Sequence, residues 1–208
     1  MPLMGEAERR YWRLQNAKSR SERSRCWFGY VVDHPLGNLT WNVIAWELTL
    51  HVPLLDEELL VDVQVHPLPE FVDEEPPPVP GIWAYDLWNA FMSEWPRSRW
   101  EEAVDCLHAA LPAIHQEWYR SVGYGVTNEL NDRALKEIER REAIAKSRDL
   151  FLATLEPIDC GLCQEKGRQW LEIGFESDFD THAGLLLRYV PGEPALQADS
   201  GDEFWPLI

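Results

Sequence analysis

The feature that most constrains this chain is a stretch of seventy-one residues, Cys26 to Pro96, with twelve Asp or Glu residues and no Lys or Arg. Such one-sided charge on a weakly apolar chain would favour a solvated, unfolded segment. This stretch is also rich in Trp, Tyr and β-branched residues, which supply apolar surface for a core. We therefore predict that it folds and carries a negative surface.

Length and composition predict one folded domain with a basic partner. At 208 residues and 45% hydrophobic content, the chain can bury one core but is short for two independent domains. The net charge of -17 argues against nucleic acid and anionic membranes as partners, because both are bound through Lys and Arg. A positively charged protein is the complementary expectation.

The sequence predicts a cytoplasmic protein without a membrane segment or cofactor. Residues 1–25 are rich in Arg and Glu and contain no apolar run of signal-peptide length. No window of about twenty apolar residues occurs elsewhere. Without a secretion signal, the four cysteines are expected to be reduced thiols: Cys26, Cys106, Cys160 and Cys163.

The basic groups are concentrated at the start and in the middle of the chain. Residues 1–25 carry seven basic and three acidic groups, and their pattern predicts a helix over Gly5 to Arg25. Its net charge of +4 is expected either to lie against the acidic segment or to belong to a frayed terminal helix.

The order of the elements predicts an α+β fold. Alternation of apolar and polar residues indicates strands within 26–66 and 157–190, whereas apolar stripes at helical spacing fill 84–155. An acidic, Pro-rich loop is predicted at 67–82 and an acidic tail at 191–208. The economical assembly is a single domain in which N- and C-terminal strands form one antiparallel sheet packed against two or three central helices.

One predicted helix, Asn128 to Leu155, has an apolar stripe that Arg141 and Arg148 interrupt. Arginines at such positions either extend out of the contact or meet acidic groups. We predict that both face carboxylates, with the acidic N-terminal sheet as their source. On the preceding helix, Glu101, Asp105 and His108 form a row that is typical of the solvated border of a buried face.

Two places offer candidate metal or catalytic chemistry. Cys160 and Cys163 have the spacing of half a zinc site, which Cys26, Cys106 or His182 would have to complete; the alternative is two small residues packing a turn. Asp178, Asp180 and His182 would suit calcium or a hydrolytic centre, although the loop lacks the glycine and distal glutamate of an EF-hand. The alternative there is an ordinary loop joining two strands. We expect no bound metal at either place.

The segment Ile173 to Arg188 resembles the ending of an uncharacterised family of small, acidic bacterial α+β domains. In that family a strand leads into a Trp-Asp-x-Glu-His-Gly-Leu turn and a second strand. Here Phe179-Asp180 and Thr181-His182-Ala183-Gly184-Leu185 occupy the turn, without the Glu and with an extra Ala. Many members are regarded as immunity proteins encoded beside secreted toxins, so the resemblance implies a cytoplasmic protein that neutralises a toxin and no catalytic residue.

Charge and resemblance together predict a non-enzymatic binding protein. Its acidic surface would occlude a cognate bacterial toxin that has a basic active-site face. The predicted contact residues are the acidic groups of the N-terminal segment: Asp56, Glu57, Glu58, Asp62, Asp73, Glu74 and Glu75. The alternatives are a metal-dependent hydrolase that uses the Asp178/Asp180/His182 loop or the Cys160/Cys163 pair, and a module whose tryptophans stack on sugars or bases.

Overall fold

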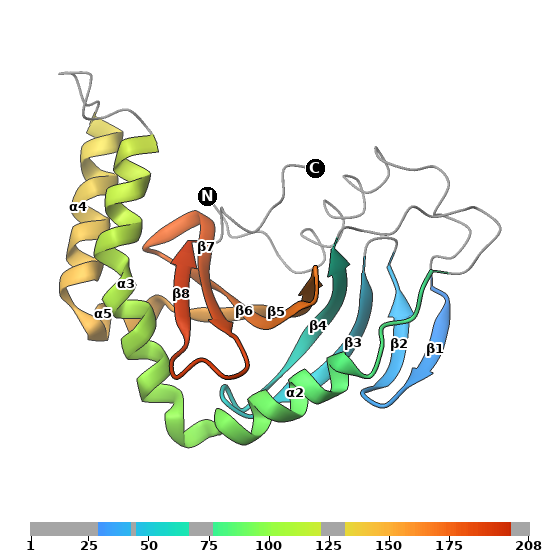
Figure 1. Cartoon of the computed structure of the whole chain (residues 1–208). Helices are drawn as coiled ribbons and strands as arrows, with labels where there is room; N and C mark the ends of the chain where they lie inside the picture. The colour runs from blue at the N-terminus through green and yellow to red at the C-terminus, as the bar shows by residue number, and fades with distance from the viewer. Residues whose placement is uncertain (1–28, 43–44, 67–76, 122–131, 201–208) are drawn as a thin grey trace.

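A computed structural model of the chain describes residues 29–42, 45–66, 77–121 and 132–200. It shows an α+β fold in which N- and C-terminal strands share one eight-stranded sheet (Figure 1). The strands are β1 (Val31–His34), β2 (Gly37–Trp41), β3 (Trp46–Val52), β4 (Glu57–His66), β5 (Glu156–Glu165), β6 (Arg168–Ser177), β7 (Asp180–Tyr189) and β8 (Gln197–Ser200). The helices are α2 (Trp83–Glu94), α3 (Trp100–Ser121), α4 (Asp132–Lys146) and α5 (Arg148–Thr154).

The sheet is mixed, so the predicted antiparallel sheet was wrong at one place. The strands lie in sequence order, and each neighbouring pair is antiparallel except β4 and β5. Two antiparallel groups of four strands are therefore joined by one parallel pair, in which Val61 lies opposite Cys160. A parallel pair needs a crossover connection, which the central helices provide.

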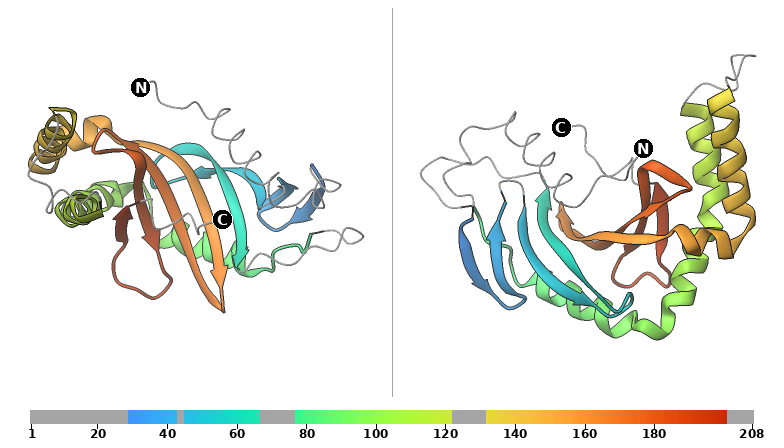
Figure 2. Two further views of the ribbon diagram at one scale, coloured as in Figure 1. Left: turned by 90° about the horizontal axis from the view of Figure 1, so that it is seen from above. Right: turned by 180° about the vertical axis from the view of Figure 1, so that it is seen from behind.

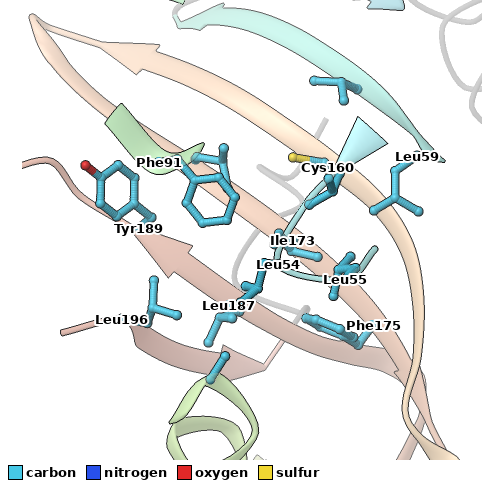
Figure 3. Close-up of a cluster of buried hydrophobic side chains, with 14 of the residues drawn as sticks. Leu54, Leu55, Leu59, Phe91, Cys160, Ile173, Phe175, Leu187, Tyr189 and Leu196 are labelled. Carbon is cyan, nitrogen blue, oxygen red and sulfur yellow. The ribbon is translucent and has the colours of Figure 1, made fainter. Parts of the chain in front are cut away.

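Helices α2 and α3 pack against the sheet and form the core with it, while α4 packs against α3 and α5. Helix α2 lies across β5 and β6, while α3 runs along β7 and β8 (Figures 1 and 2). Phe91 of α2 meets Tyr189 of β7 with ring centroids 5.5 Å apart, and it is fully buried. Figure 3 shows these rings beside Ile173 and Leu187 of the sheet. The apolar face that the alternation predicted is thus the face that the helices cover.

The predicted long helix Asn128 to Leu155 is in fact two helices within its described part. Ser147 has an extended backbone (φ -131°) between α4 and α5, and its side chain accepts a hydrogen bond from the Leu150 amide. Ser is a favoured N-cap because its hydroxyl satisfies one of the free amides of a first helical turn. Ser147 therefore ends one helix and begins the next.

Both arginines that interrupt the apolar stripe face carboxylates, as predicted, but from a different source. Arg141 is fully buried, with its Nη2 3.3 Å from Oδ1 of Asp180 and its Nε 3.0 Å from Oε1 of Glu137. Arg148 binds Glu101 and Asp105 of α3, at 2.5 Å and 2.6 Å. These acids lie on β7, α3 and α4 itself, so the predicted N-terminal source was wrong for the ion pairs described. Glu101 and Asp105 are exposed, in agreement with a solvated border, whereas His108 is half-buried with its ring centroid 5.6 Å from that of Phe151.

Several predicted segments fall on residues that the structure does not describe. The helix at 5–25 lies outside the described residues, as do 67–76 of the Pro-rich loop and 201–208 of the tail. The tail's earlier part contains β8, which the sequence did not predict. None of the helices described is both long and apolar enough to cross a membrane.

Candidate partner-binding surface

The turn between β3 and β4 presents three carboxylates to solvent. Asp56, Glu57 and Glu58 are all exposed, and the side chains of Asp56 and Glu58 are 75% and 63% accessible. Asp56 adopts a left-handed backbone (φ 62°), which Asp and Asn tolerate better than most residues. We refer to these three residues as the acidic turn.

Hydrogen bonds to the backbone fix the conformation of the acidic turn. The amides of Leu55 and Asp56 donate to the carbonyl of Val52 at 3.0 Å and 2.9 Å. Leu54 and Leu55 are buried in the core beneath, and Nη1 of Arg97 donates to both of their carbonyls at 3.1 Å and 2.8 Å. Because hydrogen bonds from its own amides and from Arg97 fix the backbone, the three carboxylates of the turn are preorganised before a partner binds.

The electrostatics of the acidic turn leave its negative charge largely exposed. His51 is its cationic neighbour when protonated, with ring nitrogens 3.6 Å from Asp56 and 3.7 Å from Glu58. The guanidinium of Arg97 is directed at backbone carbonyls. The turn therefore suits a partner that brings its own positive charge.

Asp62, a predicted contact residue, is buried and cannot serve as an exposed contact. It is 8% exposed and lies on the sheet face opposite the helices. Cross-strand pairing aligns it with six residues from other strands, in the order Thr40, Glu47, Asp62, Gly161, Glu172, Arg188 and Gln197. We call this line the carboxylate row. Glu47 and Glu172, which are 5% and 6% exposed, were not singled out from the sequence; only the strand register brings them beside Asp62.

Burial strongly affects the titration of Glu172, one of the carboxyl groups of the row. Burial raises its pKa from 4.5 to about 8, against the opposing effects of Arg188 and of the Trp170 indole N–H. Nε of Arg188 lies 3.3 Å from Oε1 of Glu172, and Trp170 donates to the same oxygen. Desolvation thus outweighs the attraction of one guanidinium and holds the group in its neutral form near neutral pH.

The shifted pKa of Glu172 predicts a pH dependence of stability. Since its folded pKa of about 8 exceeds the ordinary value of 4.5, the folded state binds more protons between these values. Glu172 should therefore lower the free energy of unfolding as pH rises through this window, by at most about 1.4 kcal/mol per pH unit. Glu172→Gln should remove that part of the slope, measured by urea unfolding at pH 5, 6.5 and 8. Parallel profiles for the two proteins would contradict the assignment.

The predicted Asp178/Asp180/His182 loop is shorter than expected. One of its two acids is buried and the other is exposed. Strand β7 already begins at Asp180, which is 3% exposed and pairs with Arg141. Asp178 is exposed, 3.9 Å from Nη1 of Arg140. The side chain of His182 lies outside the described part of the chain. Both described carboxylates already face arginines, so they do not form an open hydrolytic pair.

Cys160 and Cys163 lie in strand β5 and not in a turn. Residues three apart on a strand point to opposite faces, and the pairing agrees: Cys160 lies opposite core residue Ile173, whereas Cys163 lies opposite Trp170. Burial is the main cause that raises the pKa of each thiol well above its ordinary value. Within the described residues, no three His, Cys, Asp or Glu side chains are placed to hold one metal ion.

Of the predicted contact residues, the structure brings together Asp56, Glu57 and Glu58. Asp73, Glu74 and Glu75 lie outside the described residues. A hollow of about 360 Å³ lies on β2 to β4, and its lining offers one carboxylate and no second acid or base: Leu36, Gly37, Asn38, Thr40, Glu47, Leu48, Thr49 and Leu60. The acidic turn is therefore the best-defined candidate surface.

No family model, curated protein or solved structure matches this chain. The functional argument therefore rests on the surface itself.

Proposed function

We propose that this protein binds a basic protein, a cognate bacterial toxin, and neutralises it by covering its positively charged active-site face. The observation that carries the proposal is the acidic turn, where three exposed carboxylates stand on a fixed backbone. Enzymes that attack nucleic acids or nucleotides need a positive cleft, and a fixed group of carboxylates can mimic the charge of their substrate.

The charge of the whole molecule supports the same partner. With a net charge of -17, the field around the protein draws in positively charged proteins and repels nucleic acid. Electrostatic complementarity of this kind acts mainly on the association rate, which falls as salt rises. A fast, salt-sensitive association is therefore the kinetic property that the proposed function requires.

The proposal predicts a loss of protection when the acidic turn changes sign. The variant combines Asp56→Asn, which tolerates the left-handed backbone, with Glu57→Lys and Glu58→Lys. Co-expressed with a toxin encoded beside it, the variant should protect poorly, and its association rate at low salt should fall at least about tenfold.

The matched control makes the same change in formal charge away from the turn. Glu117→Gln, Glu139→Lys and Glu193→Lys alter exposed residues on α3, on α4 and before β8. This control should keep most of the protection and most of the association rate. Equal losses in both variants, with both shown to be folded by circular dichroism, would reduce the effect to overall charge and contradict a specific binding surface.

A further inference from the structure

The outer edge of β1 is an open edge of the sheet within the described part of the chain. β1 is the first strand of the sheet, and β2 is the described strand that pairs with it. The carbonyl of Tyr30 accepts a hydrogen bond from the amide of Trp41 at 2.8 Å, so the backbone groups of Tyr30 face β2. These groups alternate in direction along a strand, so those of Val32 also face β2, whereas those of Val31 and Asp33 face outward. Outward-facing N–H and C=O groups of this kind can pair with a further strand.

Exposed apolar side chains flank this edge. The segment that leads into α2 lies beside β1, where Nε2 of His34 is 3.4 Å from the carbonyl oxygen of Gly81 (Figure 1). Val79 and Ile82 of this segment are 47% and 57% exposed, and Val31 of β1 is 52% exposed. Clustered exposed apolar residues are typical of surfaces that bind a partner. A strand added to β1 would place its own side chains against this apolar surface.

The charge around the edge favours a basic occupant. Asp33 is exposed on β1, and no Lys or Arg occurs from Cys26 to Pro96. β1 and β3 run in the same direction because both are antiparallel to β2, so β1 ends at the same end of the sheet as the acidic turn. A second copy of the chain would bring a further net charge of -17 and another Asp33 to this edge, which opposes the pairing of two copies.

We propose that the outer edge of β1 binds an extended, basic segment of a partner protein, which adds a strand to the sheet. Main-chain hydrogen bonds to Val31 and Asp33 hold the segment in place. Its Lys or Arg side chains meet Asp33, and its apolar side chains lie against Val79 and Ile82. The acidic turn attracts the same class of partner, but strand addition does not require that the partner be a toxin.

The first test measures binding of a fluorescein-labelled decapeptide of alternating Lys and Val residues by fluorescence anisotropy. Val31→Pro removes an outward-facing N–H group and leaves the groups that pair with β2, because proline is tolerated on the open side of an edge strand. This variant should bind the peptide at least about tenfold more weakly than the wild type, whereas Val31→Thr, which keeps the N–H, should stay within about twofold. Equal affinity of the Val31→Pro variant and the wild type, both shown to be folded by circular dichroism, would overturn the proposal. So would the absence of saturable binding to the wild type up to about 1 mM peptide.

The second test changes the peptide and leaves the protein intact. The same decapeptide methylated at every backbone nitrogen keeps its charge but loses its donors, so it should bind the wild type at least about tenfold more weakly. Equal binding of the two peptides would reduce the effect to charge and overturn the proposal.

Two controls separate the edge of β1 from other binding modes. Glu57→Gln/Glu58→Gln, in the acidic turn, should change the affinity for the decapeptide by no more than about threefold at physiological salt. A loss of binding confined to that variant would place the peptide at the acidic turn and overturn the proposal. Sedimentation of the wild type should show no dimer that Val31→Pro dissociates, since such a dimer would mean that a second copy occupies the edge. None of these measurements uses the proposed toxin, so this inference and the proposed function can fail independently.

Discussion

Arg141→Ala is expected to lower the free energy of unfolding by about 3–5 kcal/mol, measured by urea denaturation at pH 7. Arg141 is fully buried on α4, and its guanidinium lies 3.3 Å from Asp180, which is only 3% exposed. Removing the arginine takes away a guanidinium that lies 3.3 Å from the buried Asp180 carboxylate. The ring of Phe179, whose centroid lies 5.4 Å from the guanidinium carbon, also loses a packing partner.

Arg148→Ala is the matched control for this variant. Arg148 interrupts the same predicted stripe and also meets two carboxylates, but its side chain is 32% exposed and those of Glu101 and Asp105 are 70% and 65% exposed. Exposed ion pairs contribute about 0–1 kcal/mol, so this change should cost no more than that. Arg141→Met/Asp180→Leu should recover part of the lost stability by removing both buried charges. Equal effects of Arg141→Ala and Arg148→Ala would contradict the burial argument.

Phe91→Ala should destabilise the fold by about 3–5 kcal/mol, because it removes a large buried ring and leaves a cavity. Phe91 is fully buried on α2, with Trp88 and Tyr189 at ring-centroid distances of 6.4 Å and 5.5 Å. It connects the helix to the C-terminal half of the sheet. The measurement is again the free energy of unfolding in urea.

Tyr85→Ala, six residues earlier on the same helix, controls for the loss of an aromatic ring from α2. Tyr85 is 37% exposed, so its removal should change stability by less than about 0.5 kcal/mol. A comparable cost at both positions would mean that α2 does not bury the face on which Phe91 lies.

The elements that the sequence predicted best are those with clear periodicity. Strand β4 lies inside the predicted strand region 26–66, and β6 lies inside the predicted strand region 157–190. The apolar stripe of α3 is buried at Val104, Leu107 and Leu111. In each of these elements one face is apolar, so spacing alone identifies both the type of element and its buried side.

Within the predicted strand region 157–190, β5 was not identified as a separate strand because its residues give little strand signal. It begins with a proline after Glu156 and contains Gly161 and two cysteines, which suggested a turn. A Cβ at Gly161 would lie 3.4 Å from Sγ of Cys163, an ordinary van der Waals contact, so space alone does not require glycine there. The break at Ser147 had a usable signal, since Ser followed by Asp149 in a first turn is typical of a helix start.

Only part of the candidate site could be predicted, because the sequence shows the pattern within one strand but not the neighbours of that strand. Alternation correctly placed Asp62 on the polar face of β4, but a single strand does not show what covers that face. Glu57 and Glu58 proved exposed because they adjoin a turn whose apolar residues, Leu54 and Leu55, point inward. Partners that depend on distant strands, such as Glu172 beside Asp62, become visible only once the register of the sheet is known.

The parallel pairing of β4 with β5 also bears on how fast this protein can reach its native state. Each group of four antiparallel strands can form largely from neighbouring hairpins. The pairing of Val61 with Cys160, in contrast, joins residues about a hundred positions apart in the chain. The entropy of closing so long a loop is lost before any contact across it is gained. The pairing of β4 with β5 should therefore be the step that limits the folding rate, because each four-stranded group can form before it. Until that pairing occurs, the inner edges of β4 and β5 are open to pairing with other chains.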